Sequence, residues 1–249
     1  MFDLTGKTAL ITGASGSLGG AIALAFGNAG ADIACHYHTN RASAEQVAGK
    51  LTAMGRRAVV LGADLSDPDE AEKLVERTVE ALGDIHILVN NAGVNREALL
   101  IRETAELVDE VLKINLAAML HMSRAAARRM ARNHWGRLIH LGSVVAHTGS
   151  TAQAAYAASK AGVEGMSRAI AREMGGRNIT SNVIAPGFIG GGMSERMSEG
   201  RKGELVRLIA LARVGKPDEI GAVAVFLASE EAGYITGEVL HVNGGMFMD

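Results

Sequence analysis

A tyrosine and a lysine four positions apart are the residues best placed to do chemistry in this chain. Tyr156 and Lys160 fall on one face of an expected helix, because positions i and i+4 share a face, so the phenol and the ammonium can point into one site. An unperturbed tyrosine has a pKa of about 10, and a nearby cation favours its phenolate. The pair therefore predicts a general acid, in which Lys160 makes Tyr156 a competent proton donor.

A serine upstream of this pair points to a carbonyl substrate. Ser143 lies thirteen residues before Tyr156, close behind an expected strand over 137–141. Its hydroxyl can hydrogen-bond a substrate carbonyl oxygen and help to stabilise the charge that develops on it. The tyrosine and lysine alone are weak evidence, because any exposed helix can carry them by chance. The serine makes the pattern more specific.

A glycine-rich turn follows the first apolar run, Thr8–Thr12, and leads directly into an expected helix. It reads Thr-Gly-Ala-Ser-Gly-Ser-Leu-Gly over residues 12–19. Glycines let the backbone approach a pyrophosphate, and the N–H groups and dipole of the helix N-terminus favour its charge. Such a turn is often only a tight connection, but its place after the first strand is the setting that a dinucleotide-binding loop requires. The expected cofactor contacts here are Gly13, Ser15, Gly16, Ser17, Leu18 and Gly19.

The end of the second expected strand indicates which dinucleotide binds. Residues 35–41 include no acidic side chain where an NAD enzyme would place one against the ribose 2′-hydroxyl. The hydroxyl, amide and guanidinium donors present would suit a 2′-phosphate, with Arg41 as the charge partner. The neighbouring donors are Tyr37, His38 and Asn40. NADPH is therefore the expected cofactor; the alternative is that Arg41 only solvates the start of a helix.

These candidate residues lie between short apolar runs that alternate with longer amphipathic stretches. Strands are expected over 8–12, 32–36, 58–61, 85–89, 137–141, 180–184 and 239–242, and helices over 18–29, 43–54, 67–82, 105–133 and 156–174. Such alternation predicts an α/β fold, a single-domain Rossmann-type doubly wound parallel sheet with helices on both faces. Ligands bind such a sheet beyond the carboxyl ends of its strands, so the residues after each strand are the ones to examine.

Composition limits the classes of protein to consider. The 249 residues fit one large α/β domain over 1–249, and 25 Lys and Arg nearly balance 27 Asp and Glu, which argues against a general affinity for nucleic acid or an anionic membrane. Cys35 is the only cysteine, so no intramolecular disulfide can form. His36 and His38 are poor evidence for a metal site without a third ligand, and no metal is predicted. The early strand at Thr8 leaves no room for a signal peptide, so a cytoplasmic location is expected.

Taken together, these motifs resemble the short-chain dehydrogenase/reductase family, and the resemblance covers essentially the whole chain. The family pattern Thr-Gly-x-x-x-Gly-x-Gly matches residues 12–19 with one departure, Asn-Asn-Ala-Gly matches 90–93, and Tyr-x-x-x-Lys matches 156–160. The resemblance implies an oxidoreductase in which Asn115 holds a water in a proton relay that runs through Lys160. The implied catalytic residues are Asn115, Ser143, Tyr156 and Lys160.

The resemblance also implies further cofactor contacts. Asp64, which alone would be interpreted as the N-terminal cap of the next helix, takes the adenine amino group, and the backbone of Ile189 meets the nicotinamide carboxamide. The motif that contains Asn91 shapes the floor under the adenine ribose. The implied contacts outside the glycine-rich turn and the 2′-phosphate donors are Asp64, Leu65, Asn91, Ala92, Gly93, Tyr156, Lys160, Pro186, Gly187 and Ile189.

Two positions depart from the family pattern. Ser17 stands where the middle glycine of the loop is expected, and its hydroxyl can add a phosphate contact. The run Gly190–Gly192 occupies the place where the family often has a threonine that binds the cofactor, so Gly191→Thr is expected to tighten cofactor binding by about one hydrogen bond. Because three glycines loosen a loop, residues 190–203 are expected to form a mobile lid over cofactor and substrate.

The later part of the chain is most similar to bacterial 3-oxoacyl-acyl-carrier-protein reductases, notably over 179–189 and 234–246. This similarity implies NADPH-dependent reduction of a carrier-linked 3-oxoacyl thioester to the 3-hydroxyacyl thioester in fatty-acid synthesis, by a homotetramer. An acidic carrier protein would need a basic patch, whereas the alternative for the arginines is a solvated helix face. The candidates for the patch are Arg128, Arg129, Arg132, Arg137, Arg172 and Arg177.

Two kinds of alternative stay open. An enzyme of the same family could reduce acetoacetyl-CoA, or act as an alcohol or ketone dehydrogenase on a small free molecule. A protein of another class could bind NADP(H) without catalysis, as a sensor or scaffold, but the complete catalytic set argues against it. A nucleic-acid role is weaker still, since the charge balance is acidic and aromatic residues make up only 4% of the chain.

Overall fold

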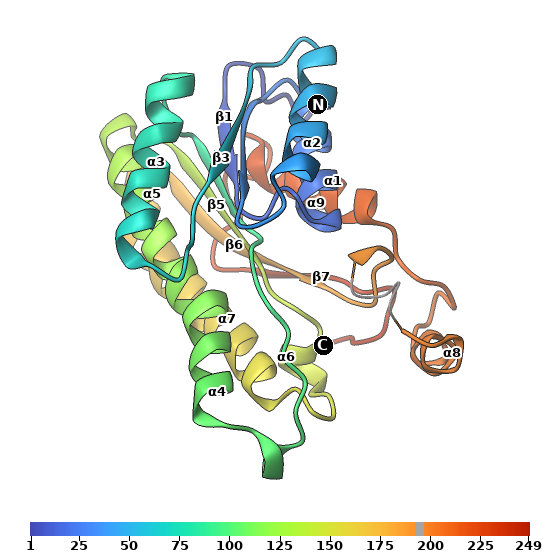
Figure 1. The fold of residues 1–249 in the computed structure, drawn as a ribbon. Helices are drawn as coiled ribbons and strands as arrows, with labels where there is room; N and C mark the ends of the chain where they lie inside the picture. Colours follow the sequence, from blue (N-terminus) through green and yellow to red (C-terminus); the bar gives the residue numbers. More distant parts are fainter. Residues whose placement is uncertain (193–196) are drawn as a thin grey trace.

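The computed structural model of the protein describes residues 1–192 and 197–249, and its centre is one parallel β-sheet (Figure 1). The strands follow the order β3-β2-β1-β4-β5-β6-β7, and each neighbouring pair is parallel. The chain order reverses beside β1, so the predicted doubly wound α/β fold is confirmed. The strands are β1 (Thr8–Ile11), β2 (Asp32–Tyr37), β3 (Ala58–Gly62), β4 (Ile87–Asn90), β5 (Gly136–Leu141), β6 (Ile179–Pro186) and β7 (Val239–Val242).

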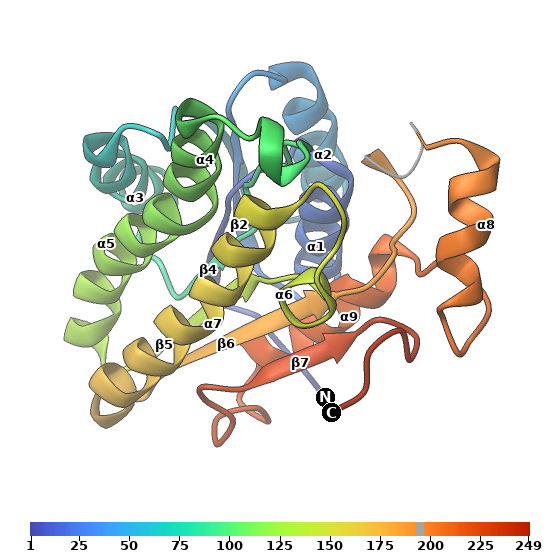
Figure 2. The same cartoon turned by 90° about the horizontal axis from the view of Figure 1, so that it is seen from below.

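Helices cover both faces of the sheet, and the two views show the layers (Figures 1 and 2). Helices α1, α2 and α9 pack on one face, whereas α3, α5 and α7 pack on the other. The α-helices are α1 (Ser17–Asn28), α2 (Arg41–Ala53), α3 (Pro68–Leu82), α4 (Ala105–Leu112), α5 (Ala118–Asn133), α6 (Val145–Thr148), α7 (Ala154–Met174), α8 (Glu199–Arg207) and α9 (Pro217–Ala228). The 3₁₀ turns η1 (Leu100–Arg102) and η3 (Gly175–Arg177) and the π-turn η2 (Lys113–Ala117) are shorter. Helices α6, α8 and α9 were outside the predicted ranges.

The sheet separates two apolar cores, as strand β1 illustrates. Ala9 and Ile11 join the core that includes Phe26 of α1, whereas Leu10 joins the core that includes Leu74 of α3. Successive strand side chains point to opposite faces, and both faces are covered, so this strand is continuously apolar. The short apolar runs of the sequence are therefore explained by burial on two sides.

The start and end of α3 show how local sequence sets the boundaries of a helix. Asp67 caps the helix through a hydrogen bond from Asp69 N–H to its carboxylate at 3.0 Å, and Pro68 follows at the first helical position. Gly83 follows the last turn with a φ of 97°, a conformation that favours glycine. Asp67 is therefore the cap, and the interpretation of Asp64 as the cap of this helix is wrong.

The helical stretch predicted over 105–133 is continuous but not regular. The π-turn η2 joins α4 to α5 and contains Asn115, which is fully buried. Such single π-turns are frequent at functional sites, because the wider turn displaces one residue from its regular direction. This irregularity, which periodicity could not reveal, places Asn115 against α7.

Candidate active site

The glycine-rich loop between β1 and α1 is shaped to admit a phosphate group. Gly13 has a φ of 67°, and a Cβ on Gly19 would overlap the Gly13 carbonyl oxygen and lie 2.6 Å from Nδ2 of Asn91. Gly16 is the N-cap that precedes α1, with extended backbone and no side chain, and the first turn of this helix has no acidic residue. The N–H groups of that turn therefore face a cradle where an anion is favoured, so these residues fit the pyrophosphate of a dinucleotide.

A hydrogen-bonded clamp joins this loop to the end of β4. The Thr12 hydroxyl accepts from the N–H groups of Asn91 at 2.9 Å and Ala92 at 3.0 Å, and it donates to the Val89 carbonyl at 3.2 Å. The Asn91 amide donates to the carbonyls of Thr12 at 2.8 Å and Gly13 at 3.2 Å. The Asn-Asn-Ala-Gly segment is thus fixed to the phosphate loop. Sequence analysis did not single out Thr12 as its support.

A buried histidine fixes the loop to β3. The ring Nδ1 of His36 accepts from Gly13 N–H at 3.1 Å, and its Nε2 lies 3.1 Å from the Ala63 carbonyl oxygen. A neutral ring with its proton on Nε2 satisfies both partners. Burial lowers the pKa of His36 from 6.5 to about 4, which keeps the ring neutral at ordinary pH. His36 therefore supports the loop through two backbone groups.

The donors predicted for a 2′-phosphate gather between β2 and α2. Arg41 is the first residue of α2, it is exposed, and its Nε donates to Glu45 Oε1 at 2.7 Å. The Asn40 side-chain oxygen accepts from Ser43 N–H at 3.1 Å, which leaves only its amide nitrogen able to donate to a ligand. Tyr37 packs so closely on the next strand that a Cβ added at Gly62 would lie 2.8 Å from its hydroxyl.

Two further predicted cofactor contacts, Asp64 and Leu65, follow β3. Asp64 is exposed, and its carboxylate accepts from Ser66 N–H at 2.9 Å, which holds its pKa below the ordinary value. His38 Nε2 lies 3.9 Å from Asp64 Oδ2, so these two predicted contacts are neighbours. Leu65 is buried in the core beneath α3. Its side chain therefore packs, and only its backbone can face a ligand.

The predicted catalytic residues come together where β5 ends beside α7. Ser143 follows β5, is only 9% exposed, and lies close enough to Tyr156 for its hydroxyl to lower the pKa of the phenol. One turn further along α7, Lys160 Nζ lies 5.7 Å from the centre of the Tyr156 ring and donates to the Leu141 carbonyl at 2.7 Å. A Cβ added at Gly93 would lie 3.7 Å from Lys160 Nζ, so this glycine keeps the space beside the ammonium open.

Asn115, in the π-turn η2, contacts α7 beside Lys160. Its amide Nδ2 donates to the Val94 carbonyl at 2.8 Å and to the Ser159 hydroxyl at 3.2 Å, and its Oδ1 accepts from Val94 N–H at 2.8 Å. Ser159 in turn donates to the backbone carbonyl of Tyr156 at 2.7 Å. Asn115 is thus tied to α7 within one residue of Lys160. Ser159 is a further support that sequence analysis missed.

Burial sets the protonation of the central pair. It raises the pKa of Tyr156, and the hydrogen bond from Ser143 only partly opposes this rise. Burial also lowers the pKa of Lys160 from 10.5 to about 8. The expected lowering of the Tyr156 pKa by Lys160 is not seen here, because burial is the largest influence on this pKa and only Ser143 opposes it. Tyr156 is kept protonated, as a proton donor must be before it reacts.

The segment after β6 is held in place by two neighbouring parts of the chain. Gly187 N–H donates to the Val242 carbonyl at 3.0 Å, and a Cβ added at Gly187 would lie 2.6 Å from the Cα of Asn243, so glycine is required. Ile189 forms a bridge with Gly215, which joins this segment to the one before α9. The predicted contacts Pro186, Gly187 and Ile189 are therefore backbone positions fixed by two neighbouring segments.

Part of the predicted lid lies outside the described residues, namely 193–196. The described remainder of 190–203 contains the start of α8, which lies at the periphery of the molecule in both views (Figures 1 and 2). Gly191 has a φ of 90° and Gly192 a φ of 58°. A side chain at position 191 would be strained, and its Cβ would overlap Ser17 Oγ. The expectation that Gly191→Thr alone tightens cofactor binding is therefore wrong.

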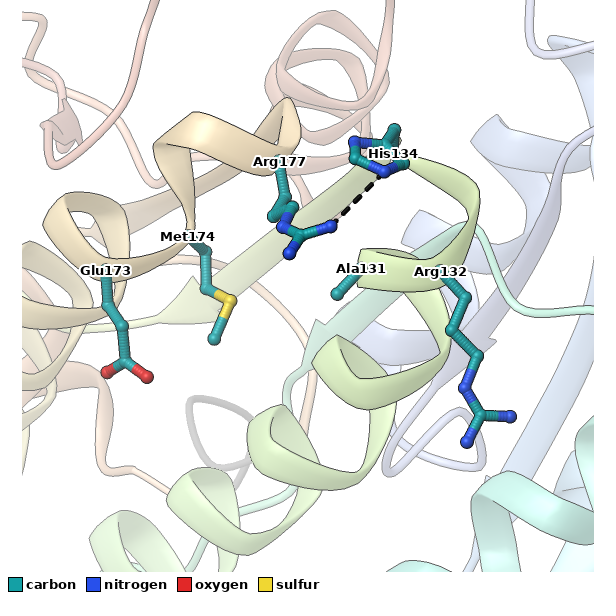
Figure 3. A pocket seen from close by; sticks show the side chains of 6 residues that line it. All are labelled: Ala131, Arg132, His134, Glu173, Met174 and Arg177. Atoms are coloured by element: carbon teal, nitrogen blue, oxygen red, sulfur yellow. Dashed lines mark hydrogen bonds between the residues drawn. The ribbon is translucent and has the colours of Figure 1, made fainter.

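The basic patch suggested by sequence lies at the opposite end of the sheet. A cleft of about 600 Å³ opens there between the ends of α5 and α7, and Figure 3 shows its lining. The lining residues are Ala131, Arg132, His134, Glu173, Met174 and Arg177. Arg172 is exposed nearby, whereas Arg128 is paired with Glu72 at 2.7 Å. Arg137 is 0% exposed, so its assignment to a docking patch is wrong.

Two further observations concern what else the site could hold. Across residues 1–192 and 197–249, no three side chains of His, Cys, Asp or Glu are arranged as metal ligands would be. In the same described parts of the chain, no helix has both the length and the apolar character needed to cross a membrane.

Comparison with known proteins agrees with this geometry. A family model described as enoyl-(acyl carrier protein) reductase matches residues 13–247. A 3-oxoacyl-[acyl-carrier-protein] reductase of Pseudomonas aeruginosa is 42% identical over 246 residues, 99% of each chain, and nodulation protein G of Rhizobium sp. (strain N33) is 40% identical over the full length of both. A solved structure titled a putative short-chain alcohol dehydrogenase from Sinorhizobium meliloti 1021 matches with a TM-score of 0.95 and 35% identity, covering 98% of each chain.

A parallel sheet, a glycine cradle for a dinucleotide and a buried Ser-Tyr-Lys-Asn group define an oxidoreductase that uses a nicotinamide cofactor. The match over 13–247 and the full-length relatives agree with this class. The chain belongs to the short-chain dehydrogenase/reductase family.

Proposed function

We propose that the protein reduces a 3-oxoacyl thioester, carried on acyl carrier protein, to the 3-hydroxyacyl thioester with NADPH, as a step of fatty-acid synthesis. The observation that carries this proposal is the convergence of Ser143, Tyr156, Lys160 and Asn115 beside the glycine cradle. The 3-oxoacyl-[acyl-carrier-protein] reductases among the relatives, at 42% and 39% identity over nearly full length, support the choice of substrate.

The ketone oxygen of the substrate would lie between the hydroxyls of Ser143 and Tyr156. NADPH, when bound, supplies the hydride to the ketone carbon. Ser143 donates a hydrogen bond to the oxygen as negative charge develops there, and Tyr156 transfers its proton to that oxygen. Because burial raises the pKa of Tyr156, the phenol keeps its proton until the oxygen becomes basic enough to take it. A C–H and an O–H bond form, and Tyr156 is left as the phenolate.

Lys160 and Asn115 would restore the proton. With a pKa of about 8, Lys160 can both hold and release a proton near neutral pH. A Cβ built on Gly93 would lie 3.7 Å from Lys160 Nζ and 3.0 Å from Asn115 Oδ1, so both side chains border the space at this glycine. Asn115 is fixed by three hydrogen bonds, so it can hold a water at a constant position for proton transfer from solvent. Lys160 Nζ donates to the Leu141 carbonyl, and its other N–H groups would be available to the nicotinamide ribose.

The proposed preference for NADPH rests on the predicted 2′-phosphate donors between β2 and α2. Arg41 is a cation at a helix N-terminus, where the helix dipole disfavours positive charge, and its Nε is paired with Glu45 at 2.7 Å. A 2′-phosphate placed there would be favoured by the guanidinium and by the helix N-terminus together. Tyr37, His38 and Asn40 supply neighbouring donors. A bound 2′-phosphate would interact favourably with both Arg41 and the helix N-terminus. The alternative, that Arg41 only solvates the start of α2, gives the neighbouring donors no role.

Docking of a carrier protein would use the arginines at the ends of α5 and α7, without Arg137. Arg172 lies sixteen residues after Tyr156 on α7, roughly 24 Å along the helix axis at 1.5 Å per residue. A carrier bound at this end would therefore need an extended arm to reach Tyr156, or would serve the site of a second subunit in the proposed homotetramer. The proposed location is the cytoplasm, where carrier-linked synthesis takes place.

The test is NADPH oxidation measured with matched ketones that differ only in their carrier. A 3-oxoacyl group is presented on acyl carrier protein, on CoA and on a short model thiol, beside simple ketones. We expect the highest kcat/KM on the carrier-linked form, and Arg172→Glu should raise KM for that form while leaving the CoA form unchanged. Equal rates on all carriers, or a preference for simple ketones, would favour an acetoacetyl-CoA reductase or a small-molecule dehydrogenase instead. Binding of NADPH without turnover of any ketone would indicate a non-catalytic sensor or scaffold.

A further inference from the structure

The short helix α6 lies directly after Ser143 in the chain and contacts its hydroxyl. Val145 N–H, at the start of this helix, donates to Ser143 Oγ at 3.2 Å. A serine hydroxyl has a single proton, and an oxygen that accepts from Val145 must direct that proton elsewhere. The proton is therefore left for Tyr156 or for a substrate oxygen, and its direction depends on where α6 lies.

Little within α6 itself fixes its position. The helix has only four residues, and no side chain caps its start. Val144 N–H donates to the Pro186 carbonyl at 2.9 Å, which ties the beginning of the segment to β6. A helix of this length is not stable in isolation, so contacts with other elements must hold the rest of it.

A buried carboxylate on α7 provides such a contact. Glu164 lies one turn after Lys160 and is only 5% exposed. Its Oε1 lies 2.7 Å from Nε2 of His147 in α6, a distance that is favourable only when Nε2 carries a proton. The other partner of Glu164 is the exposed Arg168, which is more distant at 3.4 Å. Because a buried carboxylate is costly without partners, separation of His147 from Glu164 is strongly disfavoured.

The ring of His147 is also held by two aromatic side chains near the C-terminus. It stacks on Phe247, with ring centres 4.8 Å apart and planes 26° apart. The ring of His241 packs against it edge-on, at 4.7 Å between centres. These neighbours restrict the imidazole to an orientation in which Nε2 faces Glu164. The contact between α6 and α7 is therefore fixed on both sides.

We propose that His147 and Glu164 are positioning residues for the reaction, and that their contact fixes α6 against α7 so that the Ser143 hydroxyl is held beside Tyr156. Tyr156 and Glu164 belong to the same helix, so the contact refers the position of Ser143 to the element that carries the proton donor. Both residues act through Ser143. This inference rests on the proposed reduction of a ketone, and it adds the means by which the hydrogen-bond donor to the ketone oxygen is held in place.

The first test compares turnover in variants on both sides of the contact. Glu164→Leu removes the acceptor, and His147→Phe removes Nε2–H but keeps a ring beside Phe247. We expect each to lower kcat about tenfold, because a displaced Ser143 stabilises the developing charge less well. Glu164→Gln keeps an acceptor oxygen and should retain kcat within about threefold. Arg168→Ala, the matched control, removes only the exposed partner and should keep the wild-type kcat, and the Kd for NADPH should change in none of these variants.

A double-variant cycle separates positioning from a general loss of stability. Ser143→Ala alone should lower kcat about a hundredfold. Adding Glu164→Leu to it should cause no further fall in kcat, whereas the losses of unfolding free energy should still add. Thermal unfolding shows which variants are folded, and His147→Phe takes the place of Glu164→Leu if the latter does not fold. Losses of kcat that multiply, or a wild-type kcat in the folded variants, would overturn the inference.

A measurement without substrate separates this inference from the proposed function. Ser143 opposes the effect of burial on the pKa of Tyr156, so a displaced Ser143 should let this pKa rise further. The NMR signals of ¹³C-labelled tyrosine rings report this pKa in a pH titration, and Tyr156→Phe assigns the signal. We expect the pKa to rise in Ser143→Ala, in Glu164→Leu and in His147→Phe, but not in Arg168→Ala. An unchanged pKa in Glu164→Leu and His147→Phe would contradict the inference, whereas a wild-type protein that reduces no ketone would overturn the proposed function.

Discussion

Two buried cations, Lys160 and Arg137, lie at opposite ends of the sheet and are treated differently by their surroundings. Arg137, at the start of β5, is 0% exposed but stacks on Trp135 at 4.3 Å, lies 3.5 Å from Glu230 and donates to backbone carbonyls. Lys160, at the active site, is 4% exposed and donates to one carbonyl, and within the described residues no carboxylate forms an ion pair with it. Burial lowers both pKa values, but only Arg137 has an opposing carboxylate.

This difference distinguishes Arg137, whose charge is compensated and permanent, from Lys160, whose charge can be gained and lost. Arginine cannot lose its proton near neutral pH, so a buried arginine must be compensated by partners, and Glu230 and Trp135 do this. A lysine left without a carboxylate responds by a lower pKa, which brings it to about 8 and into the range where it can exchange protons. The lack of a carboxylate beside Lys160 therefore suits the proton relay proposed for it, at a cost in stability.

The largest effect is expected from Lys160→Met, which keeps the length of the side chain and removes the charge. Turnover should fall by at least about a hundredfold, because the proton relay is lost. Stability should move the other way: an uncompensated buried ammonium is replaced by an apolar group, so the free energy of unfolding at pH 7 should be unchanged or higher. Steady-state kinetics and urea unfolding measure the two effects on one preparation.

The pH dependence of stability sharpens this prediction. The Lys160 pKa falls from 10.5 to about 8 on folding, so between these values the unfolded chain binds more protons than the folded chain. Lys160 should therefore contribute a rise of on the order of 3 kcal/mol in the free energy of unfolding between about pH 8 and 10.5. Lys160→Met should lack this rise. Parallel pH profiles for the variant and the wild type would contradict the proposed state of Lys160.

Arg41 extends the comparison to an exposed cation, whose charge is available to a ligand. Arg41→Ala should reduce the preference for NADPH over NADH by about ten- to a hundredfold, because a charge-assisted contact with the 2′-phosphate is lost. NADH affinity should change little. Michaelis constants for both cofactors measure this, and equal constants in the unaltered enzyme would defeat the assignment.

The smallest effect is expected at the structural cation. Glu230→Ala removes the carboxylate beside Arg137 and the acceptor of the Trp135 indole N–H at 2.9 Å. Glu230 is itself largely exposed, but its loss leaves the buried charge of Arg137 without a carboxylate, so the unfolding free energy should fall by about 1–3 kcal/mol. Turnover and NADPH affinity should not change. A fall in turnover at unchanged stability would show that the two ends of the sheet are coupled.

Sequence motifs predicted the fold, and they singled out residues that the structure brings together at one candidate site. Strand alternation predicted the sheet, and short-range spacing predicted Tyr156 and Lys160, since i and i+4 neighbours are fixed by the helix alone. The supports were not predictable in this way. Thr12 and His36 act through partners on other strands, and a sequence does not state which strands are neighbours.

The errors have the same origin. Arg137 was placed on a surface patch because arginine is rarely fully buried, and only the fold shows Glu230 and Trp135 beside it. The effect of a threonine at position 191 was misjudged because Ser17 lies more than 170 positions away in the sequence. The effect of a residue at such a position therefore depends on contacts with segments that are distant in the sequence.

The measurement that tests the central claim most directly is single-turnover reduction by Tyr156→Phe. This variant keeps the ring and its packing but removes the proton and one hydrogen bond to the ketone oxygen. Turnover should fall by about 10²–10⁴-fold, the usual contribution of a general acid, while the Kd for NADPH measured by fluorescence changes little. If Tyr156→Phe kept near-normal turnover on every ketone that the unaltered enzyme reduces, Tyr156 would not be the proton donor and the mechanism would be wrong.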